Sequence, residues 1–332
     1  MEQKTELVIR LSALGDVAMT VSVIDDYAKQ FPNKDIYVLT KERFAPLYTW
    51  SPENVHTIGI NVDDYKGLLG LWRLYRRLRT YNFSFVADMH DVLRTKILRT
   101  FFRFAGVRVN VIDKGRQEKH TLIGHGLNHP PLKRMQDRYR ETLGVRGETR
   151  EKGFEGFETK DERRGTRDEG RGTKIGIAPF AAYDTKMYSL NKMKEVVDML
   201  VKQGKNVFLF GGGRQEKEIL DTCVKEGVKN MCGQFQGLKE ELEFMKTLDV
   251  MLTMDSGNLH LASLMGVNTI SIWGPTHPKA GFAPENTIII QRKLDCRPCS
   301  IYGNKPCHKG TLECMNISPK EIIKVIIPKI GN

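Results

Sequence analysis

Residues 250–260 read V-M-L-T-M-D-S-G-N-L-H, and this stretch indicates the fold class. An apolar run of strand length ends at Asp255, Ser256 and Gly257, and a helical pattern follows at once. Continuously apolar strands are typical of parallel sheets that are covered on both faces. Small residues at a helix start leave backbone N–H groups open to an anion, to which the helix dipole adds its attraction. The stretch therefore predicts an α/β sheet with an anion site, toward which His260 points; the alternative is a simple helix cap followed by a core histidine.

Strand-like and helix-like segments alternate along the rest of the chain. The other apolar, β-branched runs are 6–11, 35–39, 55–60, 83–88 and 107–113 in the first half, and 174–179, 206–211, 269–274 and 287–291 in the second. Helical patterns lie between them at 17–30, 65–80, 91–104, 191–203, 215–226, 239–248 and 258–265. This order predicts two Rossmann-like domains with parallel sheets that face each other across a cleft, with ligands at the carboxyl ends of the strands.

Residues 147–172 divide the chain almost in half. Of these 26 residues, 15 are charged and 6 are glycine, so the segment cannot bury enough apolar surface to offset its ordering entropy and is expected to be a linker. We expect an N-terminal domain over 1–146, a C-terminal domain with a cysteine-rich tail over 173–317, and a final helix over 318–332 that packs back on the N-terminal domain.

The net charge of +12 is concentrated in one part of the 332-residue chain. Between Lys66 and Arg140 there are 17 Lys and Arg against 5 Asp and Glu, which accounts for the whole excess. Such a field attracts a polyanion, either a phosphorylated glycolipid, an anionic membrane surface or a nucleic acid, although a solvated helix face would look the same. No motif for nucleic-acid binding accompanies the charge. No apolar run is long enough to span a membrane and the start is unlike a signal peptide, so we expect a cytoplasmic protein.

The loop after the first predicted strand reads R-L-S-A-L-G-D, from Arg10 to Asp16. Gly15 allows a tight turn, and Asp16 lies at the start of the next helix. Asp16 either caps that helix or works at the strand end. The loop matches neither a dinucleotide-binding nor a P-loop motif.

Two loops of the second half suggest a site for a nucleotide diphosphate. Thr185 and Lys186 follow the strand at 174–179, and a glycine-rich turn leads to Glu216 after the strand at 206–211. A cation suits phosphate and a carboxylate suits ribose hydroxyls. Since the chain has no D-x-D triad to hold a divalent metal, the pattern favours metal-free binding.

Four of the six cysteines are close together near the C-terminus, at Cys296, Cys299, Cys307 and Cys314. The first pair has the C-x-x-C spacing of a tetrahedral zinc site, whereas the later spacings are less regular. Structural zinc, free thiols and disulfides all stay open at this point.

Several of these segments together resemble the lipopolysaccharide heptosyltransferases of glycosyltransferase family 9. The similar stretches are L-V-I-R-L-S-A-L-G-D-V, D-M-H-D-V-L-R-T-K, F-G-G-G-R-Q-E-K-E, M-D-S-G-N-L-H-L-A-S-L-M-G, W-G-P-T-H-P and the cysteine-rich tail, which is similar to that of heptosyltransferase II. The resemblance implies a GT-B fold and inverting, metal-independent transfer from an ADP-activated heptose to a lipopolysaccharide core acceptor at the inner face of the cytoplasmic membrane.

The resemblance also implies roles for individual residues. Asp16 corresponds to the catalytic base, and Arg10, Gly15 and Arg94 to the acceptor or phosphate side. The donor side comprises Thr185, Lys186, Glu216, Asp255, Ser256, Gly257 and His260. No cofactor is required for catalysis in this family. Two other classes stay open from the sequence: a two-lobed sugar-nucleotide epimerase, which would need no basic acceptor surface, and a basic binding protein without catalytic activity.

Overall fold

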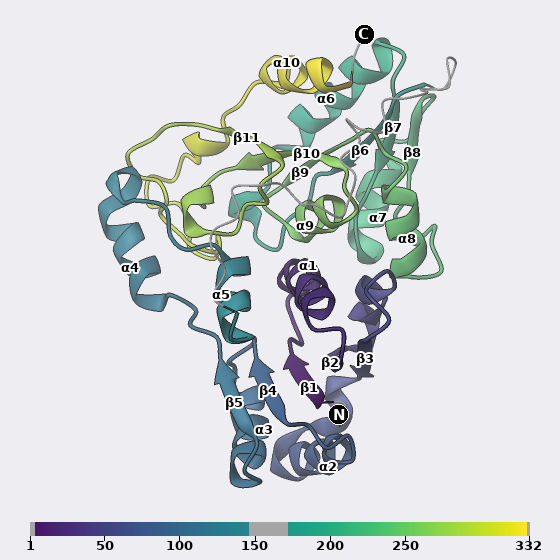
Figure 1. Cartoon of the computed structure of the whole chain (residues 1–332). Coiled ribbons are helices and arrows are strands. Elements are labelled where there is room, and N and C mark those ends of the chain that lie inside the picture. The colour runs from purple at the N-terminus through teal and green to yellow at the C-terminus, as the bar shows by residue number, and fades with distance from the viewer. Residues whose placement is uncertain (1–3, 146–171, 331–332) are drawn as a thin grey trace. The chain divides into compact units, whose positions relative to one another are not determined.

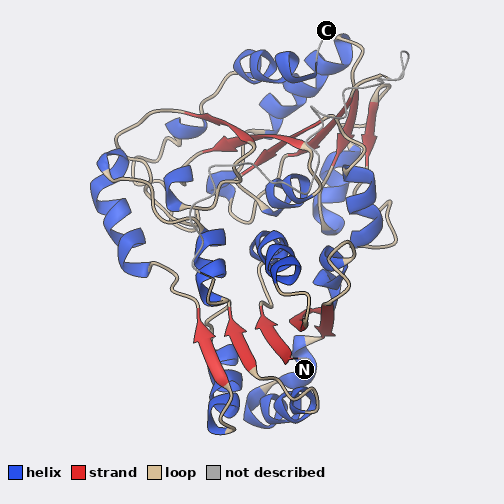
Figure 2. Ribbon diagram, in the orientation of Figure 1, coloured by secondary structure: helices blue, strands red, loops and turns tan. Residues whose placement is uncertain are grey.

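The computed structural model describes residues 4–145 and 172–330, which form two compact α/β units (Figure 1). The first unit holds the described residues up to 115 and from 133 to 145. The second holds 116–132 and everything from 172 onward. In both units the helices flank a parallel sheet (Figure 2). No helix of the described ranges has the length and apolarity required to cross a bilayer.

The sheet of the first unit has five parallel strands in the order β3-β2-β1-β4-β5. Helices α2 and α3 pack against each other, and α1 packs against α5. The strands are β1 (Lys4–Ile9), β2 (Lys34–Lys41), β3 (Val55–Ile60), β4 (Phe85–Asp88) and β5 (Arg108–Val111). The helices are α1 (Leu14–Gln30), α2 (Gly67–Arg79), α3 (Leu93–Phe104) and α5 (Met135–Thr142), with 3-10 turns at Glu42–Tyr48 and Val62–Tyr65.

The sheet of the second unit has six strands in the order β11-β10-β9-β6-β7-β8, and its strand pairs are also parallel. The strands are β6 (Lys174–Ala178), β7 (Asn206–Leu209), β8 (Val228–Asn230), β9 (Val250–Met254), β10 (Asn268–Trp273) and β11 (Thr287–Gln291). The helices are α4 (Arg116–His125), α6 (Leu190–Lys202), α7 (Gly213–Asp221), α8 (Leu238–Met245), α9 (Gly257–Leu264) and α10 (Pro319–Ile330), with 3-10 turns at Gly126–Asn128, Asp184–Lys186, Pro278–Ala280 and Glu313–Met315.

In each sheet the first strand along the chain lies in the interior, the next strands are added on one side of it, and the later strands on the other side. The direction reverses between β1 and β4 in the first unit and between β6 and β9 in the second. Ligands of open α/β sheets bind at this switch point, beyond the carboxyl ends of the strands. The topology therefore selects the loops after β1 and β4, and those after β6 and β9, as the places to look for a site.

Each sheet is buried against its own helices. Leu7 and Ile9 of β1 are fully buried and belong to a core that includes Leu74 of α2 and Leu98 of α3. In the second unit the corresponding core contains residues from β6, β7, β9 and β10 together with residues of α6 and α10. Because apolar burial is the main favourable term in folding, these two cores hold the strand ends, and hence the loops, in place.

The structure differs from the expected division of the chain in two places. Segment 116–132, expected in the N-terminal domain, belongs to the second unit because Leu122 and Leu132 pack with Ala280 and Ile301. The C-terminal helix, expected against the N-terminal domain, packs instead on α6 and contributes buried isoleucines to the second core. The predicted linker lies outside the described residues except for Gly172.

Candidate functional site

Arg10 and Asp16 form an ion pair at the end of β1. Arg10 follows the last residue of the strand and is buried, and its Nη2 lies 2.6 Å from Asp16 Oδ2. The other terminal nitrogen of the guanidinium donates to the carbonyl of Met89 at 2.6 Å. Met89 directly follows β4, the neighbour of β1 across the switch point. The pair is thereby fixed between the two strand ends, and its carboxylate is partly accessible, with 26% of the Asp16 side chain exposed.

Asp16 is also part of the cap of α1, as the alternative interpretation of the sequence had it. Its Oδ2 accepts a hydrogen bond from the backbone N–H of Ala13 at 3.3 Å. Both contacts fall on Oδ2, so Oδ1 makes no hydrogen bond with a residue that the structure describes. A capping role and a chemical role are therefore compatible in one side chain. Gly15 lies in the first turn of the same helix.

His90 is a neighbour of this pair, and it was not among the site residues predicted from the sequence. Its Nε2 lies 3.2 Å from Ser12 Oγ, in the loop that carries Arg10 and Asp16. Burial, and then the positive charges of Arg10 and Lys114, lower the pKa of His90 to about 4. The ring is consequently neutral at pH 7. Its Nδ1 is buried and has no hydrogen-bond partner among the described residues.

Arg94 lies in the first turn of α3, close in sequence to His90, and is half-buried. Among the described residues it forms no ion pair with Asp16, whose partner is Arg10. Arg99 further along α3 is engaged instead: its Nη1 lies 2.7 Å from Asp88 and 2.8 Å from Asp91. Arg99 therefore stiffens the loop after β4 and is not a free cation for a ligand.

Lys186 and Asp255 form a second ion pair, at the switch point of the second unit. Lys186 Nζ lies 2.9 Å from Asp255 Oδ2, and both side chains are largely buried. The same oxygen accepts a hydrogen bond from Thr276 Oγ1 at 2.8 Å. Lys186 follows β6, Asp255 follows β9 and Thr276 follows β10, so three neighbouring strand ends meet at one carboxylate. The motif W-G-P-T-H-P contains Thr276, but its spacing gave no reason to pair that threonine with Asp255.

Ser256 and Gly257 lie at the start of α9, as predicted. Ser256 is the residue before the helix and its Oγ lies 3.1 Å from Thr253 Oγ1, while Gly257 is the first helical residue. Three backbone N–H groups of a first helical turn have no partner within the helix and are free to meet an anion. His260 is buried one turn later on the same helix.

The other two predicted donor residues have local partners. Glu216, in the first turn of α7, accepts a hydrogen bond from the backbone N–H of Gly212 at 2.7 Å and so closes its own glycine turn. Thr185 Oγ1 donates to the carbonyl of Gly303. Glu216 follows β7, the neighbour of β6, so its loop lies on the same edge of the sheet as Lys186.

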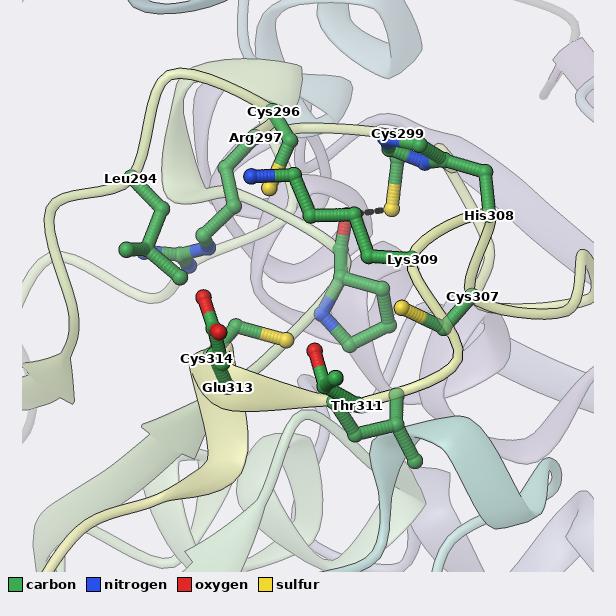
Figure 3. Close-up of a pocket in the computed structure, with 12 residues that line it drawn as sticks. Leu294, Cys296, Arg297, Cys299, Cys307, His308, Lys309, Thr311, Glu313 and Cys314 are labelled. Carbon is green, nitrogen blue, oxygen red and sulfur yellow. Dashed lines mark hydrogen bonds between the residues drawn. The ribbon is translucent and has the colours of Figure 1, made fainter.

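The four C-terminal cysteines line one small cavity of about 10 Å³ together with Arg297 (Figure 3). All six cysteines of the chain are free thiols in the structure, which removes the disulfide alternative for this conformation. Within the described ranges, no group of three or more His, Cys, Asp or Glu side chains is placed so that it could hold a metal ion.

Comparison with known proteins decides the family. The model of glycosyltransferase family 9 (heptosyltransferase) matches residues 71–308, well over half of the chain. The chain belongs to glycosyltransferase family 9. The resemblance seen in the sequence is thereby confirmed, and the two parallel-sheet units agree with it.

Relatives and solved structures agree with the family. Lipooligosaccharide heptosyltransferase 2 of Campylobacter jejuni is 28% identical over 160 residues, which are 45% of this chain and 49% of that protein, so the chain spans about half of the relative's length. A family 9 glycosyl transferase from Veillonella parvula matches with a TM-score of 0.74 at 18% identity, over 99% of this chain and 98% of that one. The E. coli heptosyltransferase WaaC, solved with ADP-2-deoxy-2-fluoro heptose, matches with a TM-score of 0.67 at 15% identity over 97% and 98%. The structural likeness shows that the fold is the GT-B fold of these enzymes.

We expect His90 to make the first unit sensitive to acid. Its pKa of about 4 lies below the value near 6.5 of an unfolded histidine, so neutral His90 stabilises the fold above pH 6.5. That contribution is lost as the pH falls from 6.5 through 4, and it amounts to about 3 kcal/mol. Urea unfolding at pH 7 and at pH 4 tests this, followed by the fluorescence of Trp50 and Trp72 in a Trp273→Phe background. Between pH 7 and pH 4, the free energy of unfolding should fall less in His90→Gln than in the protein that keeps His90. An equal loss in both proteins would contradict the burial of a neutral ring.

Proposed function

We propose that the chain transfers a heptose, or a related sugar, from an ADP-sugar to a lipopolysaccharide core acceptor, with inversion at the anomeric carbon and without a catalytic metal. The observation that carries the proposal is the buried Lys186–Asp255 pair beside the start of α9, at the switch point of a family 9 sheet. The names of the relatives support the sugar and the acceptor, and the ADP-sugar analogue bound by WaaC supports the nucleotide.

On the donor side, the diphosphate would meet Lys186 and the amides of α9. An ammonium group has three N–H donors, and the bond to Asp255 uses one of them, so others are left for phosphate oxygens. The helix start at Ser256 and Gly257 adds about half a positive charge. Glu216 would hold the ribose hydroxyls, for which it must release the N–H of Gly212. These groups would also stabilise the negative charge that appears on ADP as it leaves.

On the acceptor side, Asp16 would act as the general base. The acceptor hydroxyl attacks the anomeric carbon from the face opposite to ADP, the bond from that carbon to the diphosphate oxygen breaks, and the hydroxyl proton passes to the carboxylate. Oδ1 is available for that proton because Arg10 and Ala13 both bind Oδ2. Arg10 would thus fix the orientation of the base.

The acceptor is a lipid, and the exposed side of α2 and α3 has the properties of a surface that binds an anionic membrane. We call this side the α2–α3 face. It presents both apolar and basic side chains. The exposed apolar residues are Leu68, Leu69, Trp72, Leu93 and Phe104, of which Leu69 and Phe104 are over four-fifths exposed. The exposed basic residues are Arg73, Arg76, Arg77, Arg79, Lys96 and Arg103.

The arginines of the α2–α3 face form no salt bridge with a carboxylate in the part of the chain that the structure describes. Arg73 donates to the carbonyl of Asp64 and Arg77 to the hydroxyl of Tyr65, and neither forms a salt bridge with a carboxylate of the described residues. Large apolar side chains beside unpaired cations suit the boundary between headgroups and acyl chains of an anionic leaflet. We therefore propose a peripheral protein at the inner face of the cytoplasmic membrane.

Replacing Asp16 by Asn should abolish transfer while the fold and the ADP affinity stay unchanged. The amide keeps the shape of the carboxylate but cannot take the proton, and a positioned base contributes about 10²- to 10⁴-fold in rate. Turnover is measured with ADP-heptose and a purified core acceptor, ADP affinity by calorimetry. Retention of more than about a tenth of wild-type turnover, a barrier change below about 1.4 kcal/mol, would remove Asp16 as the base. Conversion of the donor in the absence of acceptor would instead favour an epimerase.

Replacing Lys186 by Ala should weaken ADP binding and turnover together. Loss of a charge-assisted contact costs about 1.5–3 kcal/mol, or roughly 10- to 150-fold in affinity. The matched control is Lys202→Ala, which removes an exposed lysine at the end of α6.

Transfer should persist in EDTA on the time scale of the assay. A reversible loss of activity that magnesium restores would refute metal-free transfer.

Reversing the charge of the α2–α3 face should release the protein from anionic vesicles. Each arginine near an anionic surface contributes about 1 kcal/mol, so Arg73→Glu, Arg76→Glu and Arg77→Glu combined should weaken binding by about 100-fold or more. The control combines Lys192→Glu, Lys194→Glu and Lys202→Glu, the same charge change on α6. Co-sedimentation with phosphatidylglycerol vesicles at low and high salt measures the effect. If vesicle binding changed neither in the triple variant nor with the salt concentration, this face would be an ordinary solvated surface.

A further inference from the structure

His277 is a buried histidine in the loop that follows β10, and the proposed transfer gives it no role so far. It comes directly after Thr276, which donates a hydrogen bond to the carboxylate of Asp255. Only 8% of the residue is exposed. Buried polar side chains normally have hydrogen-bond partners, so both ring nitrogens of His277 call for an account.

One ring nitrogen of His277 is used by the fold. Its Nδ1 accepts a hydrogen bond from the backbone N–H of Lys279 at 3.1 Å and so caps the 3-10 turn Pro278–Ala280. A backbone N–H can only donate, so Nδ1 carries no proton. The proton of the neutral ring is therefore on Nε2, which makes this second nitrogen a hydrogen-bond donor.

The donor at Nε2 has no partner in the part of the chain that the structure describes. Unlike Nδ1 of His90, it is not a completely buried atom. A ring that is held in the protein by one nitrogen and presents a free N–H with the other is suited to bind an oxygen of a ligand.

The ring of His277 is neutral at pH 7. Burial, and then the positive charges of Arg297 and Lys279, lower its pKa to about 4. The bond from the N–H of Lys279 has the same effect, because a protonated ring could not accept it. A neutral N–H donor suits a sugar hydroxyl, whereas cations such as Lys186 make the stronger hydrogen bonds to phosphate.

The loop that carries His277 is fixed on both sides. Before the histidine, Arg297 donates to the carbonyl of Thr276 at 2.9 Å. After it, Lys279 Nζ donates to two carbonyls of segment 116–132 at 2.6 and 2.9 Å. The direction of the Nε2–H bond is thereby set before a ligand arrives, which reduces the entropy cost of binding.

The order of the strands indicates which part of a sugar nucleotide would meet His277. The loops after β7, β6, β9 and β10 follow one another along the same edge of the sheet (Figure 1). The proposed function puts the ribose at Glu216, after β7, and the diphosphate at Lys186 and the start of α9, after β6 and β9. An extended sugar nucleotide holds ribose, diphosphate and sugar in a row, so the sugar would come next, at the loop after β10.

We propose that His277 binds the sugar of the nucleotide donor through a hydrogen bond from Nε2 to a sugar hydroxyl, and that it helps to select that sugar. The inference rests on the proposed function, which sets the direction of the nucleotide along the sheet. The ligand is a hydroxyl-bearing sugar carried on a nucleoside diphosphate. Because the bond exists before the transfer begins, its loss should lower the affinity for the donor.

Two variants separate the ligand contact from the cap. His277→Asn keeps an acceptor for the N–H of Lys279, since asparagine is a preferred N-cap residue, but its amide ends near the position of Nδ1. His277→Gln extends an amide N–H to about the position of Nε2 and gives up the cap. A purely structural histidine predicts that the Gln variant is the impaired one, whereas the ligand contact predicts the reverse.

Calorimetry with ADP-heptose and with ADP, without acceptor, measures the contact. His277→Asn should bind ADP-heptose about 5- to 10-fold more weakly than the wild-type chain, from the loss of one hydrogen bond, and ADP with unchanged affinity. His277→Gln should recover most of the affinity for ADP-heptose. His308→Asn is the matched control, because it removes an exposed histidine of the C-terminal tail, and it should change neither affinity.

The wild-type chain gives a measurement that needs no folded variant. In protein labelled with nitrogen-15, a coupling across the hydrogen bond to the amide of Lys279 identifies the Nδ1 of His277. The ring should show a bare Nδ1 and a protonated Nε2. The Nε2 signal should shift on addition of ADP-heptose and stay in place with ADP.

Three results would overturn the inference. Equal affinities of the wild-type chain and His277→Asn for ADP-heptose would remove the contact, as would a protonated Nδ1. An equal loss for ADP and ADP-heptose would assign the contact to the diphosphate instead of the sugar. A wild-type chain that binds ADP-heptose but transfers no sugar to a core acceptor would refute the proposed transfer alone, so the two proposals fail separately.

Discussion

The second unit depends on one buried ion pair, between Lys186 and Asp255. A carboxylate that is largely removed from water must be paired, and removal of one partner of such a pair typically costs about 3–5 kcal/mol because the other charge stays buried. The pair joins the ends of β6 and β9, and Thr276 adds the end of β10. Three loops that could otherwise move independently are therefore held by one oxygen, and a ligand that approaches this edge of the sheet meets groups that are already oriented.

The first unit has an ion pair at the same topological place, but it is built differently. Arg10 and Asp16 belong to one short loop and the start of one helix, and only the carbonyl of Met89 brings in the neighbouring strand. The first pair is therefore local in sequence, whereas the second joins residues 69 positions apart. Both sheets put charge at the switch point, where parallel strands leave room and helix starts provide N–H donors.

This difference explains what the sequence allowed us to predict. All the strands expected from apolar runs are present, and only β8, which has three residues, was not expected. Helices α4 and α5 were not expected either, because α4 has a weak apolar stripe and α5 only eight residues. Asp16, Lys186 and Asp255 could be selected because the carboxyl ends of parallel strands can be read from the chain. Their partners could not: neither Thr276 on Asp255 nor His90 beside Ser12 follows from spacing, since each contact joins separate strand ends.

Segment 116–132 has a consequence for how the protein can be divided. Its leucines pack with Ala280 and Ile301, and Lys279 Nζ donates to the carbonyls of Leu127 and His129 at 2.6 and 2.9 Å. A fragment ending at the charged segment 147–172 would keep these leucines and lose the surface that covers them, whereas a fragment beginning there would expose the complementary surface. Contacts between residues more than 140 positions apart also form late, because a long loop must close before they contribute. Each unit therefore has its own core, but the second unit includes a segment from the N-terminal half of the chain. During synthesis, the second unit cannot be completed until nearly the whole chain has been made.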